Sequence, residues 1–450
     1  MSCASVRPTY ANLLRTTDYG WWLGADTFGA LSESIATFAL PLIALSATGS
    51  PAIAAFVQAA GVAVQTVVGL AGGLLQDRCD RKLLMALWGG TGLTLFALAA
   101  LMQHLGWLTA PTIVALALLM GVRGGLLQDA SNTMLRGLVP DSALPKVLSM
   151  NDARDNTVSL LSGPISGLMM TISNACPLLA SAVLSLMGMV STAPIHRYWQ
   201  RTDTHRTDSQ RKASHPSNDD AANHTSTDAP AAAQTSAWKD AFSGLTWLLT
   251  NRFQRRLLLI SAALVGASNA FLLVTVMHIS ASGTATVSAG LLNMVSAASM
   301  IVGALIAPTL IDRVPGGILI GVMFVAMGIG FTGAAFTPDA SGKAAFVALA
   351  VVALPAANAV LGGFTTALVS EGNQGRVGAG SGLVQYGAYA LFAAGSGSCM
   401  QLWGYAPTCV GLAATIALAA IAAITMRSLI TLPTPQHWEE HIERWHLERH

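Results

Sequence analysis

Charged residues are scarce in this chain of 450 residues. Asp, Glu, Lys and Arg make up only 10 % of it, whereas a soluble globular domain carries about a quarter. This scarcity excludes an ordinary soluble domain. The formal net charge of +2 is also too small to indicate a protein that binds nucleic acid.

Cysteine is scarce too, and its spacing points to no chemistry. The five cysteines form an odd count without a CxxC pair or metal-ligand spacing. We prefer to interpret them as small apolar side chains packed in the protein. A disulfide between Cys399 and Cys409 stays an alternative, because both fall near the outer ends of the last two apolar segments.

Signatures of common enzymes are missing as well. The chain has no G-x-x-x-x-G-K-[ST] loop, no G-x-S-x-G and no H-E-x-x-H. His437, Glu440 and His441 have H-x-x-E-H spacing, but that fold needs another ligand well downstream. We interpret this segment as a solvated amphipathic tail and expect no enzyme, no metal site and no cofactor.

Long apolar segments dominate what the chain does contain. Apolar residues make up 53 % of it, and about twelve segments are long enough, at roughly 20 residues, to cross a hydrocarbon core. They are residues 20–46, 52–75, 83–103, 112–138, 147–172, 178–195, 257–277, 284–310, 317–336, 344–369, 377–402 and 407–427. The sequence therefore predicts an all-α membrane protein with twelve transmembrane helices.

Lysine and arginine lie almost entirely on one side of this alternating pattern. If both termini are cytoplasmic, the loops on the outer side hold only Lys343. Cytoplasmic loops are enriched in both residue types, so we expect a multi-pass protein of the cell inner membrane with both termini in the cytoplasm. The first apolar segment is too long for a cleavable signal and is expected to stay as an anchor.

A polar segment divides the spans into six and six. Residues 197–237 are rich in Asp, Asn, Ser, Thr, His and Ala and cannot bury enough apolar area to fold, which predicts a disordered cytoplasmic linker. It separates an N-terminal six-helix bundle (1–196) from an interfacial amphipathic helix and C-terminal six-helix bundle (238–430). A cytoplasmic tail (431–450) follows.

A weak internal repeat links the two halves. An Asp-Arg pair ends the second span of each half, as Asp77 and Arg78 in one and Asp312 and Arg313 in the other. Internal repeats of this kind are typical of secondary transporters.

Two motifs carry a resemblance to a known family. Residues 73–82, GLLQDRCDRK, resemble the G-x-L-x-D-R-x-G-R-[RK] signature of the major facilitator superfamily, in the same place between spans two and three, with Asp80 instead of the second glycine. In span five, Gly163, Pro164 and Gly167 of LLSGPISGLMM resemble part of the Gly-Pro motif of the antiporter branch. Several other segments look like efflux members that export drugs, macrolides or siderophores.

The resemblance implies a monomeric transporter in a lipid bilayer. Such a protein would export a small organic molecule, a drug, siderophore or metabolite, by proton antiport with alternating access. The signature loop would act as a conformational latch through Gly73, Asp77, Arg78 and Arg81, with Asp77 facing a helix that begins near Val377. The same cations can also be plain topology signals. A proton-coupled importer of this fold is the main alternative, and a channel or an intramembrane enzyme is more remote.

Four charged residues fall inside the spans: Asp26, Glu33, Arg123 and Asp129. A charge at the bilayer centre costs at least about 2.5 kcal/mol, so such residues face a partner or a water-filled cavity. We predict that Glu33 and Arg123 pair near the midplane, with Asp26 and Asp129 as a second acidic site toward the cytoplasm. Neighbouring carboxylates in low dielectric retain a proton and an arginine opposes this, so all four are candidates for proton coupling. A structural ion pair that fixes helix register is the alternative.

The second half has no carboxylate inside its spans. Its candidate substrate ligands are polar or aromatic residues, although polar contacts between helices are equally expected for each. They are Asn269, Asn293, Asn358, Gln385, Tyr386 and Tyr389. A cavity acidic on one side and neutral on the other suits a cationic or zwitterionic, partly apolar solute, while Arg123 leaves anionic chelators as an alternative. Asp152, Arg154 and Asp155 are set aside as residues that reach the interface or pair locally.

Overall fold

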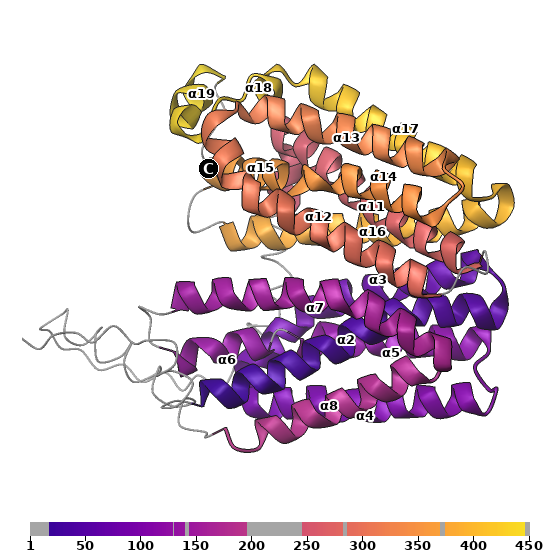
Figure 1. The fold of residues 1–450 in the computed structure, drawn as a ribbon. Coiled ribbons are helices and arrows are strands. Elements are labelled where there is room, and N and C mark those ends of the chain that lie inside the picture. Colours follow the sequence, from indigo (N-terminus) through magenta and orange to yellow (C-terminus); the bar gives the residue numbers. More distant parts are fainter. Residues whose placement is uncertain are drawn as a thin grey trace, which may run out of the picture.

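The chain folds into two helical bundles that lie side by side (Figure 1). The computed structural model describes residues 18–128, 130–139, 144–195, 245–281, 286–369 and 374–445, and every regular element within them is a helix. The first half of the chain forms one bundle and the second half forms the other. The prediction of an all-α membrane fold is confirmed.

The helices of the N-terminal bundle are α2 (Tyr19–Thr48), α3 (Pro51–Arg78), α4 (Arg81–His104), α5 (Ala110–Leu127), α6 (Ala130–Leu138), α7 (Leu144–Ile172) and α8 (Cys176–Thr192). Those of the C-terminal bundle are α11 (Arg252–Ala281), α12 (Thr286–Arg313), α13 (Gly316–Phe336), α14 (Ala340–Val352), α15 (Leu354–Leu368), α16 (Gln374–Trp403), α17 (Tyr405–Thr425) and α18 (Arg427–Ile430). The short helices η1 (Pro435–His437) and α19 (Trp438–Arg444) follow.

Each of the twelve predicted spans corresponds to a helix or to a pair of helices. The fourth span is divided into α5 and α6, and the tenth into α14 and α15. The second division falls at Ala353, two residues ahead of Pro355, because proline has no N–H to donate to the carbonyl one turn earlier. By length and composition, nine segments in the described part of the chain could cross a membrane, and two shorter helices are also apolar.

Short turns with strong capping signals join the first three helices. Gly49 ends α2 in the left-handed region at φ 65°, a conformation that costs glycine little. Ser50 then caps α3 by accepting a hydrogen bond from the Ile53 amide, and Pro51 occupies the first turn. Asp80 caps α4 by accepting a hydrogen bond from the Lys82 amide at 2.8 Å. The aspartate that departs from the family signature therefore starts a helix.

The two bundles repeat one arrangement of helices. Helices α2 and α11 each have 30 residues, and α3 and α12 each have 28 and end at Arg78 and Arg313. Helix α8 packs against α2 and α4 in one bundle, as α17 packs against α11 and α13 in the other. Helix α5 packs against α3, as α14 packs against α12. The repeat that the Asp-Arg pairs indicate is thus visible in the packing.

The bundles touch each other at one end. We call the end where residues 195 and 245 lie the linker side. On the opposite side, Ser50 Oγ donates a hydrogen bond of 2.8 Å to Gln401, and α3 packs against α16 while α7 packs against α12. Figure 1 shows the bundles meeting there and diverging toward the end that holds α6 and α15. The structure is therefore closed opposite the linker side.

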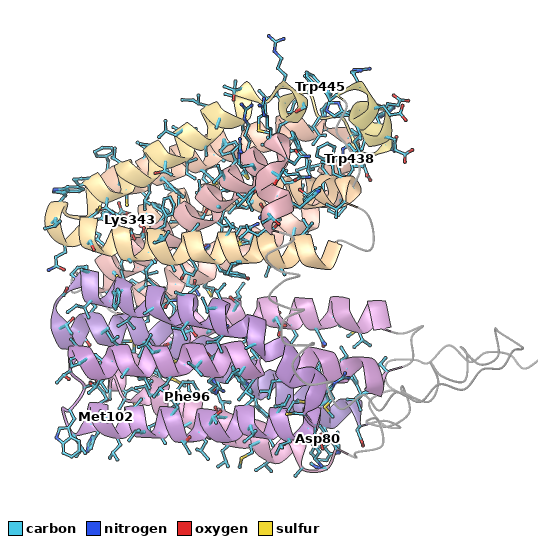
Figure 2. All side chains as sticks on the ribbon, turned by 180° about the vertical axis from the view of Figure 1, so that it is seen from behind. Asp80, Phe96, Met102, Lys343, Trp438 and Trp445 are labelled. Carbon is cyan, nitrogen blue, oxygen red and sulfur yellow. The ribbon has the colours of Figure 1, made fainter. Side chains whose placement is uncertain are left out.

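Positive charge is distributed as the sequence predicts. Among the described residues at helix ends, the cations gather on the linker side, and Lys343 alone lies on the opposite side, where Figure 2 labels it. The linker-side cations are Arg81, Lys82, Arg252, Arg255, Arg256, Arg313, Arg427 and Arg444. The asymmetry is confirmed, while the assignment of the linker side to the cytoplasm stays a prediction.

The described part of the tail is packed on the C-terminal bundle, so the prediction of a solvated tail is wrong. His441 is 4 % exposed and its Nε2 lies 2.7 Å from the Ser428 carbonyl oxygen. The ring of Trp438 lies edge-on to Phe364 with centroids 5.6 Å apart. The segment is buried on one side because Trp438 and Ile442, one turn apart, both pack against the hydrophobic core. No group of three metal-ligating side chains occurs in the described part of the chain.

Two further expectations concern the start of the C-terminal bundle and the cysteines. Residues 245–250 are helical, and Leu248 is buried against Leu258 and Val369; the rest of the predicted amphipathic helix lies outside the described residues. Cys399 and Cys409 are both free thiols, so the disulfide alternative is not present in the structure.

Candidate functional site

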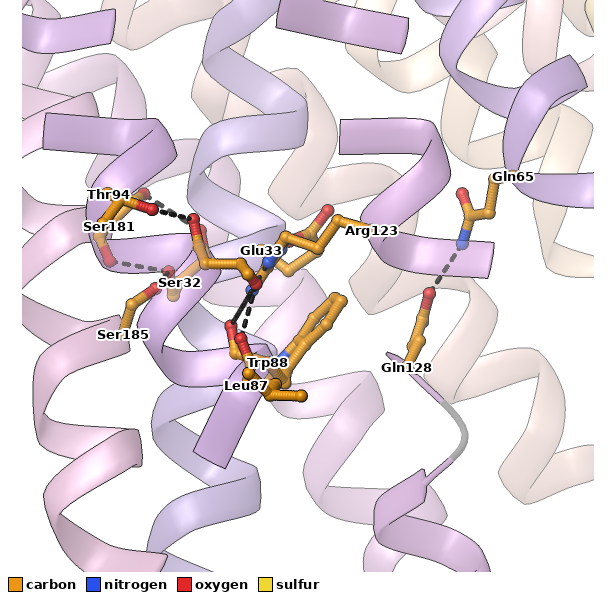
Figure 3. Close-up of polar contacts among 11 residues, drawn as sticks. Ser32, Glu33, Gln65, Leu87, Trp88, Thr94, Arg123, Gln128, Ser181 and Ser185 are labelled. Carbon is orange, nitrogen blue, oxygen red and sulfur yellow. Dashed lines mark hydrogen bonds and ion pairs between the residues drawn. The ribbon is translucent and has the colours of Figure 1, made fainter. Parts of the chain in front are cut away.

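Glu33 and Arg123 form the ion pair that is predicted from their shared position near the middle of the membrane spans. Glu33 lies in the middle of α2 and Arg123 in the last two turns of α5, with Arg123 Nη1 at 2.5 Å from Glu33 Oε2. The Arg123 side chain is only 4 % exposed, whereas that of Glu33 is 22 % exposed. Figure 3 shows both residues beside Trp88 of α4. The geometric prediction is confirmed, and the role in proton coupling stays a prediction.

Helix α4 builds the remaining surroundings of the arginine. The Trp88 carbonyl accepts hydrogen bonds from Arg123 Nη2 at 2.9 Å and Nε at 3.3 Å. The guanidinium carbon also lies 3.4 Å from the centroid of the Trp88 ring and 5.4 Å from that of Phe96. Gly92 leaves space for it, because a Cβ there would lie 2.7 Å from Nη2. Arg123 is thus held by α4 as well as by Glu33, through cation–π and hydrogen-bond contacts.

We expect Arg123→Met to destabilise the protein strongly. The change leaves Glu33 charged and without its partner, and breaking a buried pair from one side costs about 3 kcal/mol or more. Adding Glu33→Gln to the same chain should recover part of the loss, because the uncompensated charge is then removed. The midpoint of thermal unfolding of the purified protein measures both effects. Equal stability of the single and double variants would contradict this account.

A serine cluster fixes the helix that carries Glu33. Ser32 Oγ donates to the Ser181 carbonyl at 2.7 Å, and Ser181 Oγ donates to the Ser32 carbonyl at 2.9 Å. Ser32 Oγ also lies 2.8 Å from Ser185 Oγ (Figure 3). These bonds hold α2 against α8 one residue before Glu33. The sequence does not predict these bonds, although Ser181 and Ser185 have the one-turn spacing of small residues that pack between membrane helices.

Asp26 forms an ion pair that the sequence does not predict. Its carboxylate pairs with Arg154 of α7, which also donates to Asp155 Oδ1 at 2.7 Å. The local pairing expected of Arg154 is found with Asp155, whereas its pair with Asp26 is not expected, because the sequence does not reveal that the first turns of α7 run beside the start of α2. Asp129 lies outside the described residues, so the predicted acidic site of Asp26 with Asp129 stays a prediction. A proton-coupling role for Asp26 stays a prediction.

A cavity of about 370 Å³ lies between the bundles, and Glu33 is one of its lining residues. Three of the predicted substrate ligands, Asn269, Asn293 and Tyr389, line it from the C-terminal bundle. Gln58 joins them from α3 and donates a hydrogen bond of 3.1 Å to the Tyr389 hydroxyl. The remaining lining residues are Ser34, Thr37, Phe38, Pro41, Leu42, Ser159, Ser162, Leu272, Leu273 and Val276. The cavity is therefore half apolar, with one carboxylate.

The other three predicted ligands lie elsewhere. Asn358 and Gln385 line a separate cavity of about 420 Å³ among α11, α15 and α16, within the C-terminal bundle. Tyr386 is 56 % exposed and lines neither cavity. Gln385 and Tyr389 are one turn apart on the same face of α16 and differ in depth, whereas Tyr386 is rotated by about 100° from Gln385. Three of the six candidates therefore line the central cavity and three do not, and a substrate-binding role for any of them stays a prediction.

Most of the predicted latch lies outside the part of the chain whose side chains are described. Gly73, Asp77 and Arg78 belong to the last turns of α3, and nothing further is assigned to their side chains. Arg81 begins α4 directly after the capping Asp80. The latch, including the contact of Asp77 with the start of α16, stays a prediction.

The antiporter-like motif lies where the bundles touch. A Cβ on Gly163 of α7 would lie 2.8 Å from Asn293 Cβ, and one on Gly290 of α12 would lie 2.5 Å from the Gly163 carbonyl oxygen. Helix α7 continues through Pro164 without a break, and Gly167 is buried. The glycines therefore allow close contact between the bundles, as the motif predicts.

Comparisons with known proteins agree with this architecture. A family model described as Major Facilitator Superfamily matches residues 25–397. The structure is similar to that of the nucleoside transporter NupG, with a TM-score of 0.68, 14 % identity and coverage of 91 % of this chain and 98 % of that one. It is also similar to a bacterial homologue of the iron transporter ferroportin, with a TM-score of 0.64, 17 % identity and coverage of 93 % of this chain and 99 % of that one. The xylose transporter XylE from E. coli is similar as well, with a TM-score of 0.64, 13 % identity and coverage of 95 % of this chain and 99 % of that one. A comparison with curated protein sequences gave no match.

Proposed function

Because the chain belongs to the major facilitator superfamily, we propose that it exports a small organic molecule across the cytoplasmic membrane in exchange for protons. It is a multi-pass membrane transporter. The two bundles rock against each other, so that the central cavity opens alternately to either side. The linker side is the cytoplasmic side in this proposal, since cations gather there, and the structure then represents the state open to the cytoplasm.

The unequal exposure of the central ion pair carries the proposal. Arg123 is buried and held by α4, whereas the partly exposed Glu33 lines the cavity. A proton that reaches Glu33 through the cavity cancels its charge and removes the attraction to Arg123, which stays bonded to the Trp88 carbonyl. Glu33 is then free to change its contacts in the cavity. Protonation and the shape of the site are linked in this way.

The same carboxylate defines the proposed substrate class. Glu33 is the charged group that the cavity presents, beside neutral Asn269, Asn293 and Gln58 and an apolar wall. These groups suit a cationic or zwitterionic amine with an apolar portion. One carboxylate cannot hold a proton and pair with a substrate cation at the same time. Binding of one therefore expels the other, which is the requirement for antiport.

The alternatives differ in direction or in kind. An importer of this fold would carry substrate and proton in the same direction, and the partial Gly-Pro motif of α7 favours export over it. An anionic chelator as substrate is disfavoured, because Arg123 is 4 % exposed and does not line the central cavity. A channel would show flux that rises linearly with the gradient, whereas a carrier saturates.

Inverted membrane vesicles test direction and coupling together. Respiration acidifies their interior, and quenching of acridine orange reports the pH difference. Addition of ethidium, a cationic and partly apolar amine, to the outer face should release protons and restore fluorescence, saturably and only in vesicles that contain the chain. A rate of proton release that keeps rising in proportion to the ethidium concentration would indicate a channel. Uptake of the amine together with protons by intact cells would overturn export in favour of import.

A further inference from the structure

Three arginines surround a pocket on the linker side of the C-terminal bundle, apart from the central cavity. The pocket has a volume of about 410 Å³. It is lined by Arg252, Arg256, Arg427, Phe253, Thr425, Met426, Ser428 and Trp445. These residues come from the first turns of α11, the junction of α17 with α18, and the end of α19. Figure 2 shows Trp445 at this end of the bundle, with Trp438 nearby and Lys343 at the other end.

Among the residues that the structure describes, the pocket gathers positive charge and has no carboxylate in its lining. None of its lining residues is acidic, and the ion pairs found among the described residues do not include Arg252, Arg256 or Arg427. All three are exposed. The amino terminus of α11, a helix of 30 residues, adds the positive end of its dipole. Like charges gathered from two distant parts of the sequence repel each other, and an anion in the pocket removes that repulsion.

The surroundings favour a lipid over a free anion. Helix α17 leads up to the pocket with a stripe of exposed apolar residues, Leu418, Ile421 and Ile424, which are 67 %, 58 % and 62 % exposed. Such residues at helical spacing face the acyl chains in a membrane protein. Trp445, which is 38 % exposed, has the amphipathic ring that prefers the level of the head groups. A cluster of arginines next to a stripe of exposed apolar residues suits a phospholipid, which carries a phosphate and acyl chains in one molecule.

We propose that this pocket binds the head group of an anionic phospholipid from the linker-side leaflet. The guanidinium groups of Arg252, Arg256 and Arg427 hold the phosphate, since arginine matches phosphate geometry with paired donors. The Thr425 and Ser428 positions lie beside it, and an acyl chain follows the stripe on α17. Basic pockets at the cytoplasmic end of membrane helices bind anionic head groups by this chemistry. Bound lipid would join the start of α11, a helix that lines the central cavity, to α18.

Thermal unfolding of the delipidated full chain in detergent tests the site without any transport assay. We expect dioleoyl-phosphatidylglycerol to raise the unfolding midpoint, and dioleoyl-phosphatidylcholine to have no such effect. Arg256→Gln and Arg427→Gln should each require about fivefold more phosphatidylglycerol for the same shift, and the double variant about 25-fold more. These side chains are exposed, so the variants are expected to fold.

Arg255→Gln is the matched control. Arg255 lies in the same turn of α11 and is exposed, but it does not line the pocket, and its Nη1 donates to the Leu249 carbonyl at 3.3 Å. This variant should respond to phosphatidylglycerol like the unchanged protein. An equal response of all variants would overturn the site. A shift of the same size with inorganic phosphate alone would overturn the assignment to a lipid.

Discussion

Glu33→Gln should abolish substrate-driven proton release while the protein remains folded and in the membrane. Glutamine keeps the size of the side chain and a polar contact with Arg123, but it carries neither a negative charge nor an exchangeable acidic proton. Loss of a group that transfers a proton typically costs a factor of 100 or more, so we expect at least a roughly 100-fold decrease. The measurement is the rate of fluorescence recovery after addition of amine to inverted vesicles.

Ser34→Ala provides the matched control for this result. Ser34 follows Glu33 in α2 and lines the same cavity, but it has no charge to exchange. We expect proton release within about threefold of the unchanged protein, as for the loss of one neutral hydrogen bond. Persistence of full coupling in Glu33→Gln would remove Glu33 from the proposed mechanism. An equal loss of proton release in both variants would mean that the substitutions impair substrate binding and not proton transfer.

Gly397→Val should open the side of the transporter that is closed in this structure. Gly397 of α16 lies against α3, where a Cβ would lie 2.1 Å from Ala55 Cβ and 2.8 Å from the Pro51 carbonyl oxygen. Both opposing groups belong to the start of a packed helix and cannot move away easily. Overpacking costs about 1 to 3 kcal/mol, and this cost applies only to the state in which the bundles touch here. We therefore expect the equilibrium to shift about tenfold or more toward the opposite state.

Accessibility of the central cavity measures this shift. A Leu272→Cys reporter, placed in the cavity lining of a chain without its native cysteines, should react about tenfold faster with an impermeant maleimide added opposite the linker side. Gly395→Val is the matched control, because Gly395 lies on the same helix and a Cβ there meets nothing within 4 Å. Equal reactivity of the two variants would show that the α3–α16 contact does not hold the bundles closed.

The amino-acid sequence alone was enough to predict the spans, the two halves and the central ion pair. The spans could be predicted because apolar length is set by bilayer thickness and is local in the sequence. The pair of Glu33 with Arg123 could be predicted because charge inside a membrane is costly, so two opposite charges at one depth are expected to meet. The glycines of the α7 motif indicated close packing for a similar reason, since small residues let helices approach.

Rotation and long-range pairing of the helices were decided only by the tertiary structure. Asp26 pairs with Arg154 because α7 runs beside α2. The sequence gives the depth of each residue in the membrane, but it does not reveal which helices are neighbours. Gln385 and Tyr389 of α16 are four residues apart, yet they line different cavities, since Gln385 lies beside α15 and Tyr389 accepts a hydrogen bond from Gln58 of α3. The arginine pocket joins residues 252 and 427, which no local pattern connects. Depth and polarity are local properties of a membrane chain, whereas partners depend on how all of its helices pack together.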